Sequence, residues 1–203
     1  MRTKQDGEGT FTQRRRREQF VDCAIDAIAE LGFHRTSVAE VARRAQVSKG
    51  VVTYHFPARD DLILAVSGHI IGLLGEHLKS RLRGTPPERF VAGYIRTWVE
   101  CYRLYSREML ALRNIWGNFT DPSGEQFFGP HSKAGELAAV SFMLARGQER
   151  GLLRPFSPEI MAQTIKSALE ALLNQFAREP GLDLEAYGEE LVTLFERATS
   201  AGP

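Results

Sequence analysis

Apolar residues recur at intervals of three and four along most of the chain, and this helical periodicity is the feature that most limits its possible folds. Glycine or proline follows one apolar stripe, and serine or threonine precedes the next, so the pattern is divided by helix stops and starts. The divisions predict an all-α fold of about nine helices, with no credible pair of strands. A chain of 203 residues can bury one sizeable core or two small ones.

One short run contradicts this pattern at first sight. VVTYHF, residues 51–56, consists of β-branched and aromatic residues, which favour strands. A strand without a partner would leave its backbone groups unpaired, so we expect this run to be helical. Ser48 is placed to cap such a helix, and Pro57 is placed to end it.

Two further helices are predicted before this one. Apolar residues between positions 20 and 31 form a helical stripe, and Gly32 is a natural helix stop. Ser37, with Glu40 three residues later, has the capping-box pattern at the start of a helix of barely two turns. Three short helices with a tight turn between the second and third make a helix-turn-helix arrangement.

Only one stripe of the third helix can be buried in this arrangement, and Val47, Val52 and Phe56 are spaced to form it. The side chains left outside are small or aromatic, with one cation: Lys49, Gly50, Val51, Thr53 and Tyr54. This set suits a DNA groove, because small residues allow close approach, methyl groups can contact thymine, and an ammonium can reach guanine or phosphate. A structural helical hairpin is the alternative interpretation.

The distribution of charge and of reactive residues narrows the function. Residues 1–60 carry more basic than acidic side chains, densest at 14–17, and such a run either binds phosphate or is a solvated helix start. The two cysteines, Cys23 and Cys101, lie in apolar helical patterns and indicate neither a disulfide nor a metal site. The five histidines are scattered, and no nucleophile motif or glycine-rich phosphate loop is present. We therefore expect no enzyme, no catalytic or metal-binding residues and no cofactor.

The N-terminus has a basic run but no apolar segment of the signal-peptide kind. The most apolar window, residues 62–75, is too short and too interrupted to span a bilayer. These two features predict a cytoplasmic protein without a membrane partner.

The segment GFHRTSVAEVARRAQVSKGVVTYHFPARDDL, residues 32–62, resembles the DNA-binding segment of the TetR family of transcriptional regulators. The similarity extends over about residues 14–64, and beyond residue 65 it is only architectural. It implies phosphate contacts from Thr36, Ser37, Ser48, Tyr54, His55 and Arg59. It implies that Lys49, Gly50 and Thr53 face the major groove.

Three positions depart from the family pattern. Gln46 stands where a turn glycine is common, so that turn must accommodate a side chain. Thr53 stands where tyrosine is commonest, and Arg59 stands where the family usually has a phosphate-binding lysine, which keeps the charge but changes its geometry.

A long face rich in aromatic residues extends over positions 98–119 of the larger half. Its members follow one another by three or four residues: Trp98, Tyr102, Tyr105, Met109, Leu112, Trp116 and Phe119. Such a face either packs as core or lines a ligand cavity, and Phe142 is a further candidate for the same cavity.

The last two predicted helices have broad apolar faces. These faces contain Ile165, Leu169, Leu172, Phe176, Tyr187, Leu191 and Leu194. Two such helices from each subunit can form a four-helix bundle about a two-fold axis, so these residues are predicted at a homodimer interface. Burial within one subunit is the alternative.

The sequence thus predicts a flexible tail over residues 1–13, a helix-turn-helix DNA-binding domain over 14–60, and an effector-binding and dimerisation domain over 61–203. The last begins with a connecting helix at 61–83. The resemblance implies a ligand-responsive regulator, most commonly a repressor, that binds a palindromic double-stranded DNA operator as a dimer and is released by a small molecule. The alternative is a DNA-binding regulator or architectural protein without a small-molecule effector.

Overall fold

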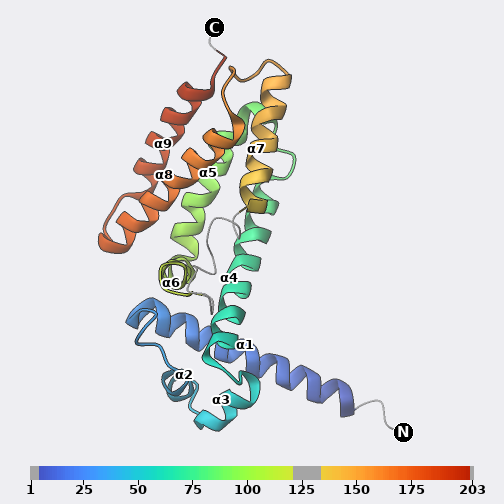
Figure 1. Cartoon of the computed structure of the whole chain (residues 1–203), viewed down its shortest axis with the longest axis vertical. Helices are drawn as coiled ribbons and strands as arrows, with labels where there is room; N and C mark the ends of the chain where they lie inside the picture. The colour runs from blue at the N-terminus through green and yellow to red at the C-terminus, as the bar shows by residue number, and fades with distance from the viewer. Residues whose placement is uncertain (1–4, 121–133, 202–203) are drawn as a thin grey trace. The chain divides into compact units, whose positions relative to one another are not determined.

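The chain is helical throughout the part that the structure describes, residues 5–120 and 134–201 of a computed structural model (Figure 1). Nine α-helices and no strand lie within these ranges, which confirms the all-α prediction. The helices are α1 (Gln5–Leu31), α2 (Val38–Arg44), α3 (Lys49–His55), α4 (Arg59–Leu82), α5 (Pro87–Leu104), α6 (Ser106–Trp116), α7 (Ala134–Glu149), α8 (Pro158–Arg178) and α9 (Leu184–Thr199).

Serine side chains cap the starts of α2 and α8, whereas Ser48 is the N-cap residue of α3 but makes no side-chain capping hydrogen bond. The Ser37 hydroxyl accepts a hydrogen bond from the amide of Glu40 at 3.2 Å, and Ser157 caps α8 in the same way. Gly32 follows α1 with φ of +84°, a left-handed conformation that glycine adopts without strain. The strand-like run VVTYHF forms α3 and its C-cap.

One helix start differs from the sequence-based expectation. Helix α1 begins at Gln5, although residues 1–13 were expected to form a tail; the described side chains from 11 to 19 are all exposed, so no apolar stripe marked this stretch. At α5, Pro86 is the N-cap and Pro87 the first helical residue. The loop expected over residues 120–135 lies almost entirely outside the described residues.

The first of two compact units contains the chain up to Leu73 together with Leu110–Phe119. Within it α1 packs on α2, and α2 packs on α3. The amide of Asn114 donates to the carbonyl of Ile28 at 3.0 Å and ties the end of α6 to α1. The buried core of this unit consists of Phe20, Ala24, Ile28, Val41, Val52, Phe56, Leu62, Val66, Leu112 and Ile115.

The second unit contains Leu74–Met109 and the chain from Thr120 onward. Helix α5 contacts α7, α8 and α9, and α8 contacts α7 and α9, so α5 and α8 run through the middle of the bundle (Figure 1). Its core includes Val91, Ile95, Trp98, Tyr102, Leu144, Ile165, Leu169, Leu172, Val192 and Phe195. The buried Tyr102 hydroxyl donates to the carbonyl of Leu169 at 3.0 Å, which satisfies a polar group within this core.

Helix α4 is long and apolar enough, by length and composition alone, to cross a membrane. The apolar window at residues 62–75, which by itself is too short to span a bilayer, is part of this helix of 24 residues. Its apolar residues Leu62, Val66 and Ile70 are buried in the protein, whereas Leu64 and Ile71 are 38% and 46% exposed.

Candidate functional site

Helix α3 separates its side chains into a buried and an exposed set. Val52 and Phe56 are fully buried, and Val47 before the helix is half-buried. On the other side lie Lys49, Gly50, Val51 and Tyr54, all exposed; 72% of the Tyr54 surface is accessible. A Cβ added to Gly50 would meet only the Ser48 hydroxyl, at 3.8 Å, so the backbone itself is open to a close approach.

Thr53, which is predicted to face the major groove, lies half-buried on the same helix. Its hydroxyl oxygen is 3.2 Å from the carbonyl of Lys49 and 3.1 Å from that of Gly50. The hydroxyl proton is therefore used inside the helix, and what remains for an external partner is the methyl group and the acceptor capacity of the oxygen.

The turn between α2 and α3 is a Schellman motif with glutamine in the position usually held by glycine. Gln46 has φ of +55° and is the only non-glycine residue with positive φ among residues 5–120 and 134–201. The amide of Val47 donates to the carbonyl of Ala42 at 3.0 Å, and that of Gln46 to Arg43 at 3.2 Å, which closes the motif. The turn thus holds a side chain in left-handed backbone, at a cost of about 1–2 kcal/mol.

Arg17 of α1 holds the end of α3. Its guanidinium donates to the carbonyl of His55 and lies over the Phe56 ring, 4.2 Å from the ring centre. The His55 ring in turn packs edge-on against Phe20, with centroids 5.5 Å apart. Burial, together with the nearby arginines, lowers the pKa of His55, so the imidazole is neutral near pH 7. Arg17, a member of the basic run at residues 14–17, therefore stabilises the first unit through internal contacts.

Two side chains that are predicted to contact phosphate make hydrogen bonds within the protein. The Arg59 guanidinium donates to the carbonyls of Thr36, at 2.9 Å, and Phe33, at 2.6 Å, and lies over the Phe33 ring. Thr36 is buried, and its hydroxyl donates to the carbonyl of Gly32 at 3.0 Å. Both side chains hold the loop that leads into α2 in place, because they donate hydrogen bonds to its backbone carbonyls. The exposed hydroxyls of Ser37 and Ser48 remain at the helix starts.

The arginines of α2 are balanced by carboxylates. Glu40 accepts from Arg43 and Arg44, and Arg44 also donates to Glu30 at 2.8 Å. Hydrogen bonds from these arginines lower the pKa of Glu40 to about 2, so the carboxylate stays ionised. Much of the positive charge on α2 is therefore neutralised locally, which leaves Lys49 as the cation on the exposed face of α3.

The aromatic-rich face over residues 98–119 is largely core. Trp98, Tyr102 and Met109 are buried in the second unit, whereas Leu112 and Phe119 are buried in the first. Tyr105 and Trp116 are half-buried, and Phe142 projects from α7 with 60% of its surface exposed. The structure therefore does not bring the eight predicted ligand contacts together, because helices with broad apolar faces distribute them among several packing layers.

The predicted dimer residues divide in a similar way. Ile165, Leu169, Leu172 and Leu191 are buried within one subunit, so they are not available at a surface. Phe176 and Tyr187 are half-buried, and Leu194 is 59% exposed. The exposed Ile160 of α8 and the predicted Leu194 of α9 line an apolar groove, together with Phe156, Met161, Thr164 and Phe195.

A buried polar cluster in the second unit was missed by the sequence analysis. Lys166 of α8 is 3% exposed, lies 4.0 Å from the centre of the Trp98 ring and pairs with Glu136 of α7 at 2.9 Å. The Tyr94 hydroxyl donates to the same carboxylate at 2.5 Å. The detectable signal was a lone lysine within the apolar stripe of Ala162, Ile165 and Leu169 on α8.

A second polar group connects α4 to α5 and to the residue that follows α5. His77 contacts Glu100 at 3.2 Å through one ring nitrogen and the Tyr105 hydroxyl at 3.2 Å through the other. Glu100 also accepts from Arg81, and these partners, despite partial burial, hold its pKa below the usual value. Tyr105, a predicted ligand contact, is therefore a member of this network.

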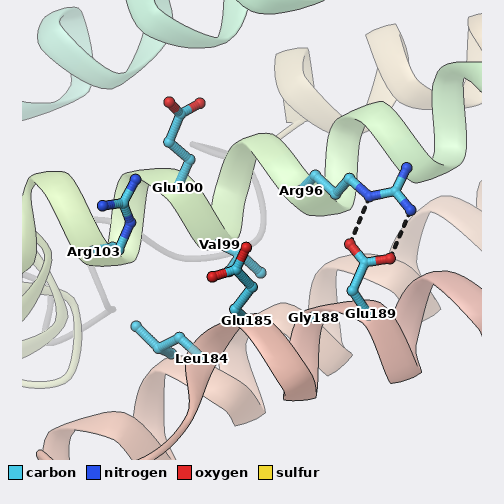
Figure 2. Close-up of a pocket in the computed structure, with 8 residues that line it drawn as sticks. All are labelled: Arg96, Val99, Glu100, Arg103, Leu184, Glu185, Gly188 and Glu189. Atoms are coloured by element: carbon cyan, nitrogen blue, oxygen red, sulfur yellow. Dashed lines mark hydrogen bonds and ion pairs between the residues drawn. The ribbon is translucent and has the colours of Figure 1, made fainter.

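A polar surface pocket of about 260 Å³ lies between α5 and α9 (Figure 2). Arg96 donates two hydrogen bonds of 2.6 Å to Glu189 at one end, and Glu100, Arg103 and Glu185 lie at the other. None of the predicted ligand residues lines this pocket, and its charges are of both signs.

The family model for bacterial regulatory proteins of the tetR family matches residues 20–66, the segment that builds and supports the α3 face. This match to the tetR family covers less than a quarter of the chain. It is similar to the HTH-type transcriptional regulator BetI of Serratia proteamaculans (strain 568), with 38% identity over 68 residues, or 34% of each chain. The similarity thus spans about a third of the length of that relative.

Solved structures resemble this chain over nearly its whole length. A transcriptional regulator from Saccharomonospora viridis in complex with choline has a TM-score of 0.80 and 16% identity, covering 92% of this chain and 98% of that one. AibR in complex with isovaleryl coenzyme A and operator DNA has a TM-score of 0.76 and 19% identity, covering 88% and 97%. At these identities the likeness concerns the fold.

Proposed function

We propose that this chain is a ligand-responsive repressor that binds a palindromic DNA operator as a homodimer in the cytoplasm and is released by a small molecule. The observation that carries the proposal is the exposed face of α3, where Lys49, Gly50, Val51 and Tyr54 present one cation, an open backbone and apolar groups to the outside. Such a face is poorly suited to water and well suited to the major groove.

The roles of individual residues follow from their exposure. Lys49 reaches guanine acceptors or phosphate, Val51 and the Thr53 methyl meet thymine methyls, and Gly50 allows close approach. Ser37 and Ser48, at the starts of α2 and α3, and Tyr54 contact phosphates. Thr36, His55 and Arg59 support this surface from inside; any phosphate contact by them uses atoms beyond the internal bonds described above.

Dimerisation is proposed through the outer faces of α8 and α9. Ile160 is 69% exposed and Leu194 is 59% exposed, and the groove between them is apolar, a surface suited to burial against a second copy. Sedimentation of Leu194→Asp should show monomers, while Phe142→Asp, which alters an equally exposed residue on α7, should remain dimeric. A Leu194→Asp protein that sediments as wild type would contradict this interface.

A small-molecule effector is supported by the fold likeness to regulators solved with choline and with isovaleryl coenzyme A. Binding in the second unit would shift α4 and thereby the separation of the two α3 helices. A ligand can do this only if it binds the free and DNA-bound states with different affinities.

The alternative, a DNA-binding regulator without an effector, is favoured by one observation: Trp98, Tyr102 and Met109 are packed in the core rather than around an open cavity. If the chain does respond to an effector, that molecule must bind elsewhere or displace one of these side chains.

The direct test is selection of binding sites from random double-stranded DNA with the purified protein. The proposal predicts enrichment of a palindrome whose half-sites lie about one helical turn, roughly 34–36 Å, apart or at a multiple of it. Recovery of unenriched DNA, or of single half-sites only, would refute dimeric operator binding.

A further inference from the structure

Helix α8 carries one basic side chain on a face that is otherwise apolar. The Lys166 ammonium lies 3.0 and 2.9 Å from the two carboxylate oxygens of Glu136 and over the Trp98 ring. A buried ammonium is strongly unfavourable unless it is paired and hydrogen-bonded. Three helices, α5, α7 and α8, each contribute a residue to this arrangement.

The cluster has more donors than acceptors. Glu136 accepts from both the Lys166 ammonium and the Tyr94 hydroxyl. The indole N–H of Trp98 is buried and has no hydrogen-bond acceptor among the described residues. Burial and the nearby Glu136 raise the pKa of Tyr94, so its hydroxyl remains a donor at neutral pH. An ammonium and a phenol that donate to one carboxylate, beside the buried Trp98 ring, are the chemistry of an anion-binding site.

The two partners of the ion pair differ in their access to water. The Lys166 side chain is 4% exposed, whereas that of Glu136 is 30% exposed. Glu136 can therefore move into solvent when another carboxylate replaces it on the ammonium, whereas Lys166 cannot leave without a large rearrangement. If the carboxylate of a bound molecule takes the place of the Glu136 carboxylate, the Lys166 ammonium keeps a negatively charged partner. That carboxylate needs only the space that the Glu136 carboxylate vacates.

We propose that Lys166, Trp98 and Tyr94 bind the carboxylate head group of an acidic small molecule, which displaces the Glu136 carboxylate. This rests on the proposed effector response and names the ligand class for it. Because Glu136 belongs to the first turn of α7, the exchange breaks the ionic link between α7 and α8. Ligand binding thereby changes the packing within the bundle.

Cationic ligands are the competing chemistry, since an aromatic ring beside a carboxylate also suits an ammonium group. A cation would have to take the place of Lys166, the partner that is almost fully enclosed. The geometry therefore favours acids over amines.

The test uses the fluorescence of Trp98 in the full-length chain. The protein has two tryptophans, so Trp116→Phe leaves Trp98 as the only indole. Titration with straight-chain carboxylates from acetate to octanoate should change the emission saturably, and alkyltrimethylammonium salts of matched chain length should not. Saturable binding of the ammonium salts alone would overturn the proposal.

Variants of the ion pair sharpen the test. Glu136→Gln removes the internal competitor but keeps an acceptor for Tyr94, so carboxylate affinity should rise several-fold. In the double variant Glu136→Gln/Lys166→Met no charge is left unpaired, so the chain should fold, and carboxylate binding should be lost. Lys79→Met, at an exposed lysine on α4, is the matched control and should bind as wild type. Unchanged affinity in the double variant would overturn the assignment.

Operator affinity, measured separately on the same proteins, distinguishes the two proposals. Operator binding without any carboxylate binding would defeat the acidic-ligand site alone. Carboxylate binding that leaves operator affinity unchanged would uphold the site and refute induction through it.

Discussion

The two units of this protein differ in the exposure of their candidate binding residues, which lie at the surface in the first unit and in the interior of the second. In the first unit the exposed face of α3 carries Lys49 and Tyr54, while internal contacts such as those of Arg17 only hold the helix in place. In the second unit Lys166 and Tyr94 are buried, and only Glu136 reaches water. The difference fits the two partners that we propose: a DNA groove must be met at a surface, whereas a small molecule is bound most selectively where donors are enclosed.

The largest expected effect separates the inner and outer sides of α3. Phe56→Ala removes a fully buried ring that also packs under Arg17, and it should lower the free energy of unfolding by about 3–5 kcal/mol. Tyr54→Ala, two residues away, removes an exposed ring and should change stability by about 0.5 kcal/mol or less. Urea denaturation followed by circular dichroism measures both.

Operator affinity should depend on the exposed ring, although stability does not. Tyr54→Ala should weaken operator binding while leaving the fold intact. Equal stability losses in Phe56→Ala and Tyr54→Ala would show that the assignment of inner and outer faces is wrong.

A smaller effect tests the packing of the second unit. A Cβ on Gly188 of α9 would lie 2.8 Å from a methyl group of Val99 on α5, so these helices approach closely (Figure 2). Gly188→Ala should therefore cost about 1–3 kcal/mol through overpacking. Gly72→Ala in α4, where nothing lies within 4 Å, should instead stabilise by up to about 1 kcal/mol. Thermal denaturation of the two variants should give shifts of opposite sign; two increases in Tm would mean that α5 and α9 are not in close contact.

The smallest effect concerns the turn of the first unit. Gln46→Gly relieves the left-handed backbone at this position and should stabilise the protein by up to about 1 kcal/mol. Gln46→Ala keeps the Cβ and is the control, with no gain expected. Equal stability of the glycine and alanine variants, by urea denaturation, would argue against strain in this turn.

The sequence predicted the first unit in detail because each of its short helices has a single narrow apolar stripe. Val52 and Phe56 could face only inward, and the outer positions of α3 followed from them. The exceptions were Thr36 and Arg59, whose internal hydrogen bonds go to loop carbonyls that no side-chain pattern reveals.

The second unit could be predicted only as a set of helices. Broad apolar faces on α5, α8 and α9 do not indicate which residues meet the core, a cavity or another subunit, so Leu172 and Leu194 looked equivalent although one is buried and the other exposed. The pairing of Lys166 with Glu136 joins residues from different helices, and spacing along one helix cannot show it.

The most direct test of the DNA-binding account is the salt dependence of operator affinity for wild type and Lys49→Ala, with the exposed Lys79→Ala as control. A dimer with roughly 6–10 phosphate contacts should show log affinity falling linearly with log salt, with a slope of about −5 to −9. Lys49→Ala should lower affinity and either reduce the slope, if Lys49 meets phosphate, or relax base specificity, if it meets guanine. Affinity that is insensitive to salt, or a Lys49→Ala protein that binds like Lys79→Ala, would contradict a DNA-reading role for the exposed face of α3.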